Sequence, residues 1–270
     1  MLPASSNDRP AALTIAGSDS GGGAGIQADL RTFAAHGVHG TTVLTSLTAQ
    51  NPEQVAAVEV CPAEFVQKQL SQVAGYFDVR ALKTGMLADA DIVRTVADFL
   101  KQHPDIPSVV DPVVVSTSGA TLLEVDAIEA VRGALLPNAS LITPNLDEAV
   151  VLLGEPIASE SDMRAAARKL AETFATAVLL KGGHLGENRV IDVLQAPGAD
   201  ALVMQGTRIE NVDTHGSGCT LSAAIAANLA TGETLTNAVR AAHAYLRRCL
   251  EDPVRLKGRA FINHGPGRSH

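Results

Sequence analysis

A run of small residues opens an alanine-rich segment in the last quarter of the chain. Residues 214–219 read Thr-His-Gly-Ser-Gly-Cys, and residues 217–230 are rich in alanine. We expect a helix over 217–230, whose first turn would leave backbone N–H groups free at the positive end of the helix dipole. Such a turn predicts an anion hole for a phosphoryl group in transfer. The candidate residues are Thr214, Gly216, Ser217, Gly218 and Cys219.

Two side chains of this turn could take part in chemistry. Cys219 stands in the first helical turn, where a thiolate is favoured, although a small buried thiol that packs on the sheet is the alternative. His215 could contact a substrate or phosphate, or only shape the loop. Cys61 and Cys249 lack such surroundings, so we expect structural roles for them.

A glycine-rich loop, residues 17–25, separates a predicted strand from a predicted helix. Glycines let the backbone approach a ligand, and loops after parallel strands are where α/β folds bind ligands. The pattern around Gly23 and Gly25 formally matches a dinucleotide fingerprint, but the turn is too long and the expected acidic residue is missing. The loop predicts a ligand site that begins at Gly17, and a flexible connection is the alternative.

Charged residues also stand where other predicted strands end. Asp111 ends one strand, and Lys181 precedes Gly182-Gly183-His184, where a cation beside glycines suits a phosphate. An ordinary turn is the alternative at Lys181. Asn145 and Glu148 fit a helix capping box, and Glu148 could also order water around a magnesium ion.

One carboxylate falls on the buried side of its predicted helix. Asp29 lies between Ile26 and Phe33 on the helical wheel. A buried carboxylate is costly without a partner. Asp29 therefore needs either a charged neighbour or a ligand.

These residues must be positioned by an α/β fold, since apolar runs alternate with helical patterns along the chain. Such alternation predicts a mostly parallel sheet between two helical layers, as one domain over residues 11–260. Residues 191–206 instead indicate a hairpin and a small antiparallel edge. The expected strands are Ala11–Ala16, Thr41–Ala49, Val55–Val60, Ala81–Thr84, Ser108–Asp111, Ser140–Thr143, Ala177–Lys181, Arg189–Leu194 and Ala201–Gly206.

The composition narrows the function classes. The 270 residues carry a net charge of −8, which argues against non-specific nucleic-acid binding. No apolar stretch is long enough to span a membrane. Three scattered cysteines favour a reducing cytoplasm over a disulfide framework. We expect residues 1–10 to be a disordered leader. Residues 261–270 could carry a substrate contact or be an unstructured tail, and we expect the latter.

Seven motifs then occur in one order over nearly the whole chain: GSDSGGGAGIQADL, LTAQN, KTGML, VVDPV, ITPNLDEA, LKGGH and THGSGCTLSAA. Together they resemble the hydroxymethylpyrimidine/phosphomethylpyrimidine kinases of thiamine synthesis, in the ribokinase-like superfamily. The resemblance implies two ATP- and Mg²⁺-dependent phosphorylations. The first acts on the hydroxymethyl group of 4-amino-5-hydroxymethyl-2-methylpyrimidine, and the second converts the monophosphate to the diphosphate.

The resemblance also implies roles for individual residues. Asp29 and Gln50 would hydrogen-bond the aminopyrimidine, and Met86 and Val113 would pack on its ring, near Gly17. Asp111 and Glu148 would lie at the magnesium–phosphate network. Lys181, Asn145 and Thr214 would contact the nucleotide. Gly216, Ser217 and Gly218 would form the anion hole, and Cys219 would be the base, so that Cys219→Ala would lose catalysis with the pyrimidine still bound.

Two other functions remain open at this point: a pyridoxine or pyridoxal kinase on the same scaffold, and a non-catalytic nucleotide-binding regulator. The polar stretch 116–121 is expected to form a flap over the site. The resemblance further implies a homodimer, which would suit the predicted hairpin edge.

Overall fold

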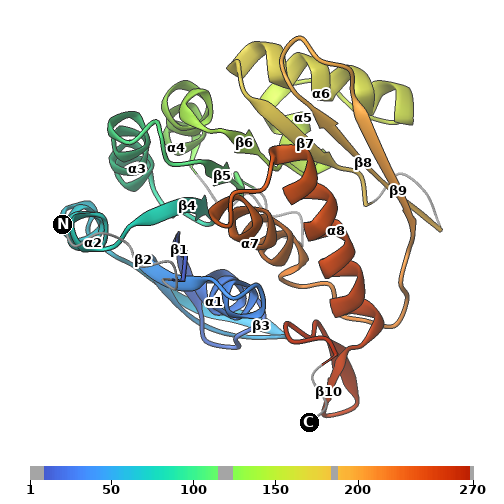
Figure 1. Ribbon diagram of the computed structural model, residues 1–270, viewed down its shortest axis with the longest axis horizontal. Helices are drawn as coiled ribbons and strands as arrows, with labels where there is room; N and C mark the ends of the chain where they lie inside the picture. Colours follow the sequence, from blue (N-terminus) through green and yellow to red (C-terminus); the bar gives the residue numbers. More distant parts are fainter. Residues whose placement is uncertain (1–8, 115–123, 184–187, 268–270) are drawn as a thin grey trace.

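A nine-stranded sheet forms the centre of the computed structural model, which describes residues 9–114, 124–183 and 188–267. The strand order is β3-β2-β1-β4-β5-β6-β7-β8-β9, and the strands from β2 to β7 run parallel (Figure 1). All nine expected strands are present. Their bounds are β1 (Ala11–Asp19), β2 (His39–Asn51), β3 (Gln54–Val60), β4 (Val79–Thr84), β5 (Ser108–Val110), β6 (Leu141–Ile142), β7 (Ala177–Lys181), β8 (Arg189–Gln195) and β9 (Leu202–Thr207).

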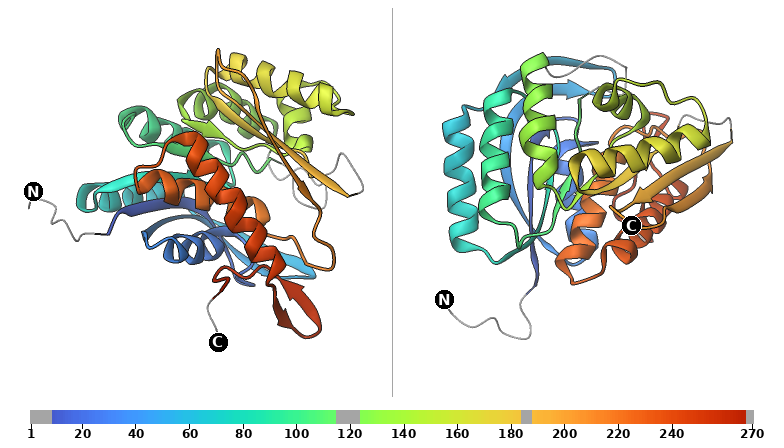
Figure 2. Two further views of the ribbon diagram at one scale, coloured as in Figure 1. Left: turned by 45° about the vertical axis from the view of Figure 1, so that its right-hand side comes forward. Right: turned by 90° about the horizontal axis from the view of Figure 1, so that it is seen from above.

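Helices cover both faces of the sheet, so the predicted three-layer α/β architecture is confirmed. One face carries α1, α7 and α8, and the other carries α2 to α6 (Figure 1). Figure 2 shows α2, α3 and α4 side by side along their face. The bounds are α1 (Gly25–Ala35), α2 (Ala63–Tyr76), α3 (Ala90–Gln102), α4 (Val125–Ala130), α5 (Leu146–Leu153), α6 (Glu160–Phe174), α7 (Ser217–Ala230) and α8 (Leu235–Glu251).

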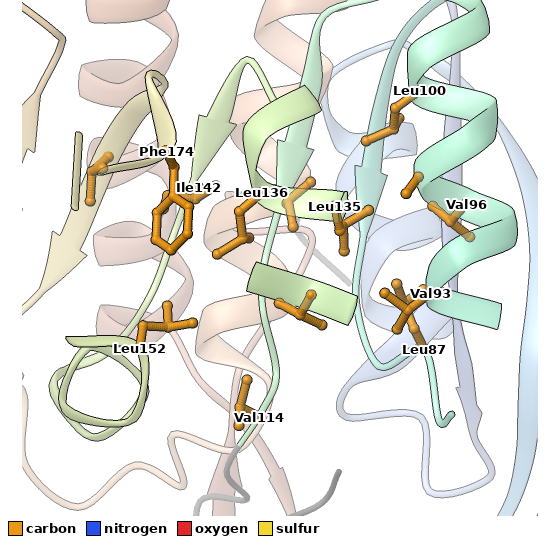
Figure 3. Packing of buried hydrophobic residues seen from close by; sticks show 14 of the residues in the cluster. Leu87, Val93, Val96, Leu100, Val114, Leu135, Leu136, Ile142, Leu152 and Phe174 are labelled. Atoms are coloured by element: carbon orange, nitrogen blue, oxygen red, sulfur yellow. The ribbon is translucent and has the colours of Figure 1, made fainter. Parts of the chain in front are cut away.

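Two apolar cores hold these layers together. On the α2–α6 face, side chains of α3 meet Leu135 and Leu136 from the helical turns after α4 (Figure 3). On the other face α7 is buried along most of its length, from Thr220 to Ala227. Its small residues let the helix pack closely between the sheet, α1 and α8. This packing fixes the amino end of α7 at the carboxyl ends of the parallel strands.

Both edges of the sheet are antiparallel, although the sequence predicted only one such edge. The expected hairpin is confirmed, because β8 pairs antiparallel with β9. At the opposite edge β3 also runs antiparallel to β2. The two strands are joined by Pro52 and Glu53 alone, and the Asn51 side chain accepts the N–H groups of Glu53 and Gln54. So short a connection cannot make a parallel crossover.

The C-terminal segment is more ordered than expected. A second, two-stranded sheet pairs β10 (Val254–Leu256) with β11 (Arg259–Phe261), and the chain beyond it is buried at Ile262, Asn263 and His264. The prediction of an unstructured tail is therefore wrong for residues 261–264. Within the residues described here, no helix combines the length and the apolar character needed to cross a bilayer.

Candidate active site

The anion-hole candidates lie at the amino end of α7. Gly216 is the N-cap, with φ of 83°, and the space where a Cβ would stand is taken by the carbonyl group of Gly23. Only glycine fits this position without strain. Among the described residues, the N–H groups of Gly218 and Cys219 have no backbone acceptor, and no side chain caps the helix. This is the geometry that an anion hole requires.

Gly218 faces a charge pair from two strand ends. A Cβ added to Gly218 would lie 3.3 Å from Lys181 Nζ and 3.5 Å from Asp111 Oδ2. Lys181 Nζ donates to Asp111 Oδ1 at 3.0 Å, and the Thr143 hydroxyl donates to the same oxygen at 2.9 Å. The side chain of Lys181 keeps 16% of its surface exposed, and that of Asp111 keeps 5%. The fold thus brings Asp111, Lys181 and the α7 turn together.

Glu148 is the third ionisable group of this cluster. Its N–H donates to Asn145 Oδ1, and its carboxylate accepts the Asn145 N–H, both at 2.8 Å, so the predicted capping box is confirmed. Burial raises the pKa of Glu148 to about 7, even though Lys181 lowers it. Burial lowers the pKa of Lys181, but Asp111 and Glu148 raise it above its ordinary value. The site therefore combines the Lys181 ammonium with a carboxyl group, that of Glu148, whose pKa is near 7.

The pKa of the Cys219 thiol is not lowered, contrary to the expectation from its place in the first turn of a helix. Burial raises the pKa of its thiol, the Lys83 ammonium lowers it, and the carboxylates of Asp29 and Asp111 raise it further. The net shift is upward, so the expectation of a favoured thiolate is wrong. The combined effect of burial and the two carboxylates thus outweighs that of the Lys83 ammonium.

Asp29 has a protein partner. Lys83 Nζ donates to its two carboxylate oxygens at 2.9 and 3.0 Å, and the Thr14 hydroxyl donates at 2.6 Å. Both side chains of the ion pair are fully buried. The alternative of a charged neighbour therefore holds. The prediction that Asp29 bonds the pyrimidine directly is contradicted, because no atom of its side chain is accessible.

The glycine-rich loop is organised by Asp19, a residue that the sequence did not single out. Its carboxylate accepts the N–H groups of Gly21, Gly23 and Ala24 at 2.7 to 2.9 Å. The ring of His215 approaches the same carboxylate at 3.4 Å, so it connects the loop to the α7 turn. Burial raises the pKa of Asp19, but these hydrogen bonds outweigh it and hold the pKa well below the usual range. The loop is a built structure, and the alternative of a flexible connection does not hold.

The remaining substrate candidates stand at neighbouring strand ends. A Cβ on Gly17 would lie 2.9 Å from Met86 Cε, so the ends of β1 and β4 meet there. Val113 follows β5 with φ of 41°, a costly conformation for a β-branched residue that is typical of functional sites. Gln50, at the end of β2, bonds the Ser20 hydroxyl through both its backbone groups. Gln50 is thereby attached to the glycine loop.

Three further predicted features remain: Thr214, His184 and the segment 116–121. Thr214 is exposed, and its carbonyl group accepts the Ser217 N–H at 3.0 Å. His184 and the proposed flap over 116–121 lie outside the described residues. Lys83 was missed, although a charged residue inside an apolar strand is a signal that it is paired.

Comparisons with known proteins agree on one family. The family model described as phosphomethylpyrimidine kinase matches residues 19–264. A hydroxymethylpyrimidine/phosphomethylpyrimidine kinase of Rhizobium meliloti (strain 1021) is 48% identical over 258 residues, which cover 94% of this chain and 96% of the relative.

Solved structures show the same fold. The ADP complex of a pyridoxal kinase from Bacillus subtilis has a TM-score of 0.88 at 36% identity and covers 96% of this chain and 98% of its own. A phosphomethylpyrimidine kinase from Clostridium difficile 630 has a TM-score of 0.79 at 39% identity and covers 88% and 98%. The family and the ribokinase-like fold expected from the seven motifs are confirmed. The chain therefore belongs to the phosphomethylpyrimidine kinase family and is an ATP-dependent phosphotransferase.

Proposed function

We propose that this site transfers the γ-phosphoryl group of ATP to the hydroxymethyl group of 4-amino-5-hydroxymethyl-2-methylpyrimidine, and then phosphorylates the monophosphate to the diphosphate. The observation that carries the proposal is the uncapped start of α7, which faces Lys181 and Asp111 across Gly218. Family membership supplies the reaction class, and the names of the relatives supply the acceptor.

Positioning and charge stabilisation do most of the work in phosphoryl transfer. In the proposed mechanism the N–H groups of the 216–219 turn, with Gly218 and Cys219 foremost, meet the charge that develops on the migrating group. Lys181 holds the phosphates of the nucleotide, assisted by Asn145 and Thr214. Cys219 would accept the proton of the hydroxymethyl group late in the reaction, as a thiolate that has already released its own proton to solvent. Its raised pKa makes this thiolate a minor form but a stronger base.

A magnesium ion fits the two carboxylates beside Lys181. Among the described residues, no three His, Cys, Asp or Glu side chains gather around a possible metal site. Mg²⁺ does not need three, since it usually keeps several waters and binds through one or two carboxylates and the phosphates of the substrate. Asp111, whose Oδ1 accepts from both Lys181 and Thr143, and Glu148 are the two carboxylates that would hold the ion, through water. When bound, Mg²⁺ neutralises phosphate charge.

The pyrimidine is proposed to bind where β1, β2, β4 and β5 end. Met86 and Val113 supply apolar surface beside Gly17, and Gln50 offers an amide donor and acceptor to the ring. Asp29 acts only indirectly, since it fixes the buried Lys83. This assignment places the acceptor hydroxyl next to the start of α7.

The test is acceptor-dependent ADP release by the purified protein with Mg²⁺ and ATP. The pyrimidine and its monophosphate should each stimulate ADP release, and ³¹P NMR should show the monophosphate and then the diphosphate. Without an acceptor, ADP release should stay at background. If neither pyrimidine stimulates release, the proposed substrate is wrong.

A pyridoxal kinase activity is the second candidate, because a solved pyridoxal kinase superposes with a TM-score of 0.88. The same assay with pyridoxal and pyridoxine decides between them. We expect a higher kcat/KM for the pyrimidine, and a reversed order would favour the second candidate.

We further propose a homodimer, but through the β2–β3 edge instead of the 191–206 hairpin edge that the sequence suggested. All of β3 is exposed, including Val55, Val58 and Val60. A cytoplasmic location and a lack of nucleic-acid binding also remain proposals. Sedimentation velocity would test the homodimer, which should dissociate in a Val58→Glu variant.

A further inference from the structure

The C-terminal segment contacts the chain on both sides of the α7 turn, and its first contact lies just before the turn. The Asp213 N–H donates to the Ala260 carbonyl at 2.8 Å, and the Arg259 guanidinium donates to the Asp213 carboxylate at 2.9 Å. Asp213 also accepts the N–H of His215 at 3.0 Å. The entry into the turn is thus attached to β11.

The second contact lies just after the turn. His264 Nε2 is 3.0 Å from the Thr220 hydroxyl. That hydroxyl is 2.9 Å from the Gly216 carbonyl oxygen, which also accepts the Thr220 N–H at 2.8 Å. A chain of two hydrogen bonds therefore connects His264 to the N-cap residue of α7.

The protonation of His264 suits this arrangement. Its side chain is buried, and burial together with the Arg31 charge lowers its pKa to about 4, so the ring is neutral at pH 7. A hydroxyl has one proton, so Thr220 can donate to Gly216 only while His264 donates to Thr220 through Nε2–H. One ring tautomer fixes the direction of the whole chain.

The segment that carries His264 is itself fixed on α8. The Tyr245 hydroxyl donates to the His264 carbonyl at 2.7 Å, and the Asn263 N–H donates to the Cys249 carbonyl at 3.1 Å. A cavity of about 580 Å³ lies between this segment and the turn, with Asp213 and His215 in its wall. The contact between His264 and Thr220 itself is buried, so water does not compete for this hydrogen bond.

We infer that His264 is a positioning residue for phosphoryl transfer: through Thr220 it fixes the Gly216 carbonyl, and with it the direction of the N–H groups at the start of α7. This inference rests on the proposed role of that turn as the anion hole. In this role His264 touches neither the substrate nor the nucleotide. It acts by orienting the N–H groups at the start of α7, which contact the phosphoryl group.

The test compares His264→Gln with His264→Asn. The amide nitrogen of glutamine can take the place of Nε2, whereas that of asparagine stands nearer the position of Nδ1 and cannot reach Thr220. We expect His264→Asn and His264→Ala to lower kcat by roughly 10-fold, since they loosen an anion hole without removing a donor. His264→Gln should keep kcat within about 3-fold of the parent, and KM for the pyrimidine should change little in all three.

A double-mutant cycle with Thr220→Val tests the route. If His264 acts through Thr220, the double variant should be no slower than the slower single variant. Multiplying effects, or equal loss in His264→Gln and His264→Asn at equal thermal stability, would overturn the inference. Asn263→Ala is the matched control, because its side chain bonds Asp252 and Gly265 rather than the turn, and it should keep the parent kcat.

The outcome is separable from that of the proposed function. A parent enzyme that phosphorylates the pyrimidine and is slowed by Gly218→Ala supports the anion hole, whatever His264 does. If Gly218→Ala has parent activity, the anion-hole proposal fails. If only the His264 contrast is absent, this inference alone fails.

Discussion

Two lysine–aspartate pairs lie close enough to Cys219 to change its pKa, and they differ in access to water. Lys83 and Asp29 are 2.9 Å apart with both side chains fully buried. Lys181 and Asp111 are 3.0 Å apart and keep 16% and 5% of their side-chain surface. We therefore propose that the same chemistry serves as scaffold in the Lys83–Asp29 pair and as part of the nucleotide site in the Lys181–Asp111 pair. The difference is that the fold leaves part of the Lys181 side chain accessible beside Gly218, whereas it buries both side chains of the Lys83–Asp29 pair.

Lys83→Ala should give the largest effect, on stability. It leaves Asp29 as an unpaired buried carboxylate, which costs about 3–5 kcal/mol of unfolding free energy. Replacing both partners, as Lys83→Met with Asp29→Leu, should cost much less. Urea unfolding measures both variants. If Lys83→Ala were as stable as the parent, the buried Lys83–Asp29 pair would not stabilise the fold.

Lys181→Ala should act on catalysis instead. Because the Lys181–Asp111 pair keeps some contact with water, we expect a smaller loss of thermal stability than for Lys83→Ala but a fall of about 100-fold in kcat/KM for ATP. Steady-state kinetics at varied ATP gives the value. Lys169→Ala, which breaks an exposed pair with Glu155, is the control and should match the parent. A Lys181 variant with parent kinetics would remove the contrast between the two pairs.

Cys219→Ala tests the residue that both pairs influence. As a base in its thiolate form, Cys219 should contribute about 100-fold to kcat. KM for the pyrimidine should change little, since the ring contacts are intact. Undiminished turnover would take the base assignment away from Cys219 and leave the turn as the main catalytic element.

Glu148→Gln should have the smallest effect and sharpens the contrast through pH. Burial raises the pKa of Glu148 from its ordinary 4.5 to about 7, so the folded chain holds a proton in this window that the unfolded chain releases. Stability therefore falls as pH rises from about 4.5 to about 7.

Glutamine keeps an acceptor for the Asn145 N–H but has no proton to lose. The unfolding free energy of Glu148→Gln should vary less across this window than that of the parent. Asp147→Asn, an exposed neighbour in the same helical turn, should keep the parent slope. Identical slopes for all three proteins would contradict the raised pKa.

The local parts of this structure could be predicted from the sequence, and the pairings could not. Alternation of apolar runs and helical patterns gave every strand of the main sheet, and the spacing of Asn145 and Glu148 gave the capping box. The direction of β3 was missed because a strand pattern carries no direction. Lys83 as the partner of Asp29, 54 residues away, and His264 as the neighbour of Thr220, 44 residues away, depend on the tertiary fold. Likewise, the helix start predicted a thiolate at Cys219, but burial decides its pKa.

The central claim is that the N–H groups at the start of α7 bind the migrating phosphoryl group. The most direct measurement is the ¹H–¹⁵N spectrum of the protein with Mg²⁺, ADP, the pyrimidine and aluminium fluoride, which mimics that group. The amide protons of Gly218 and Cys219 should move strongly downfield on adding fluoride, more than any other amide outside the nucleotide site. Shifts confined to the surroundings of Lys181, with these two amides unmoved, would contradict the account.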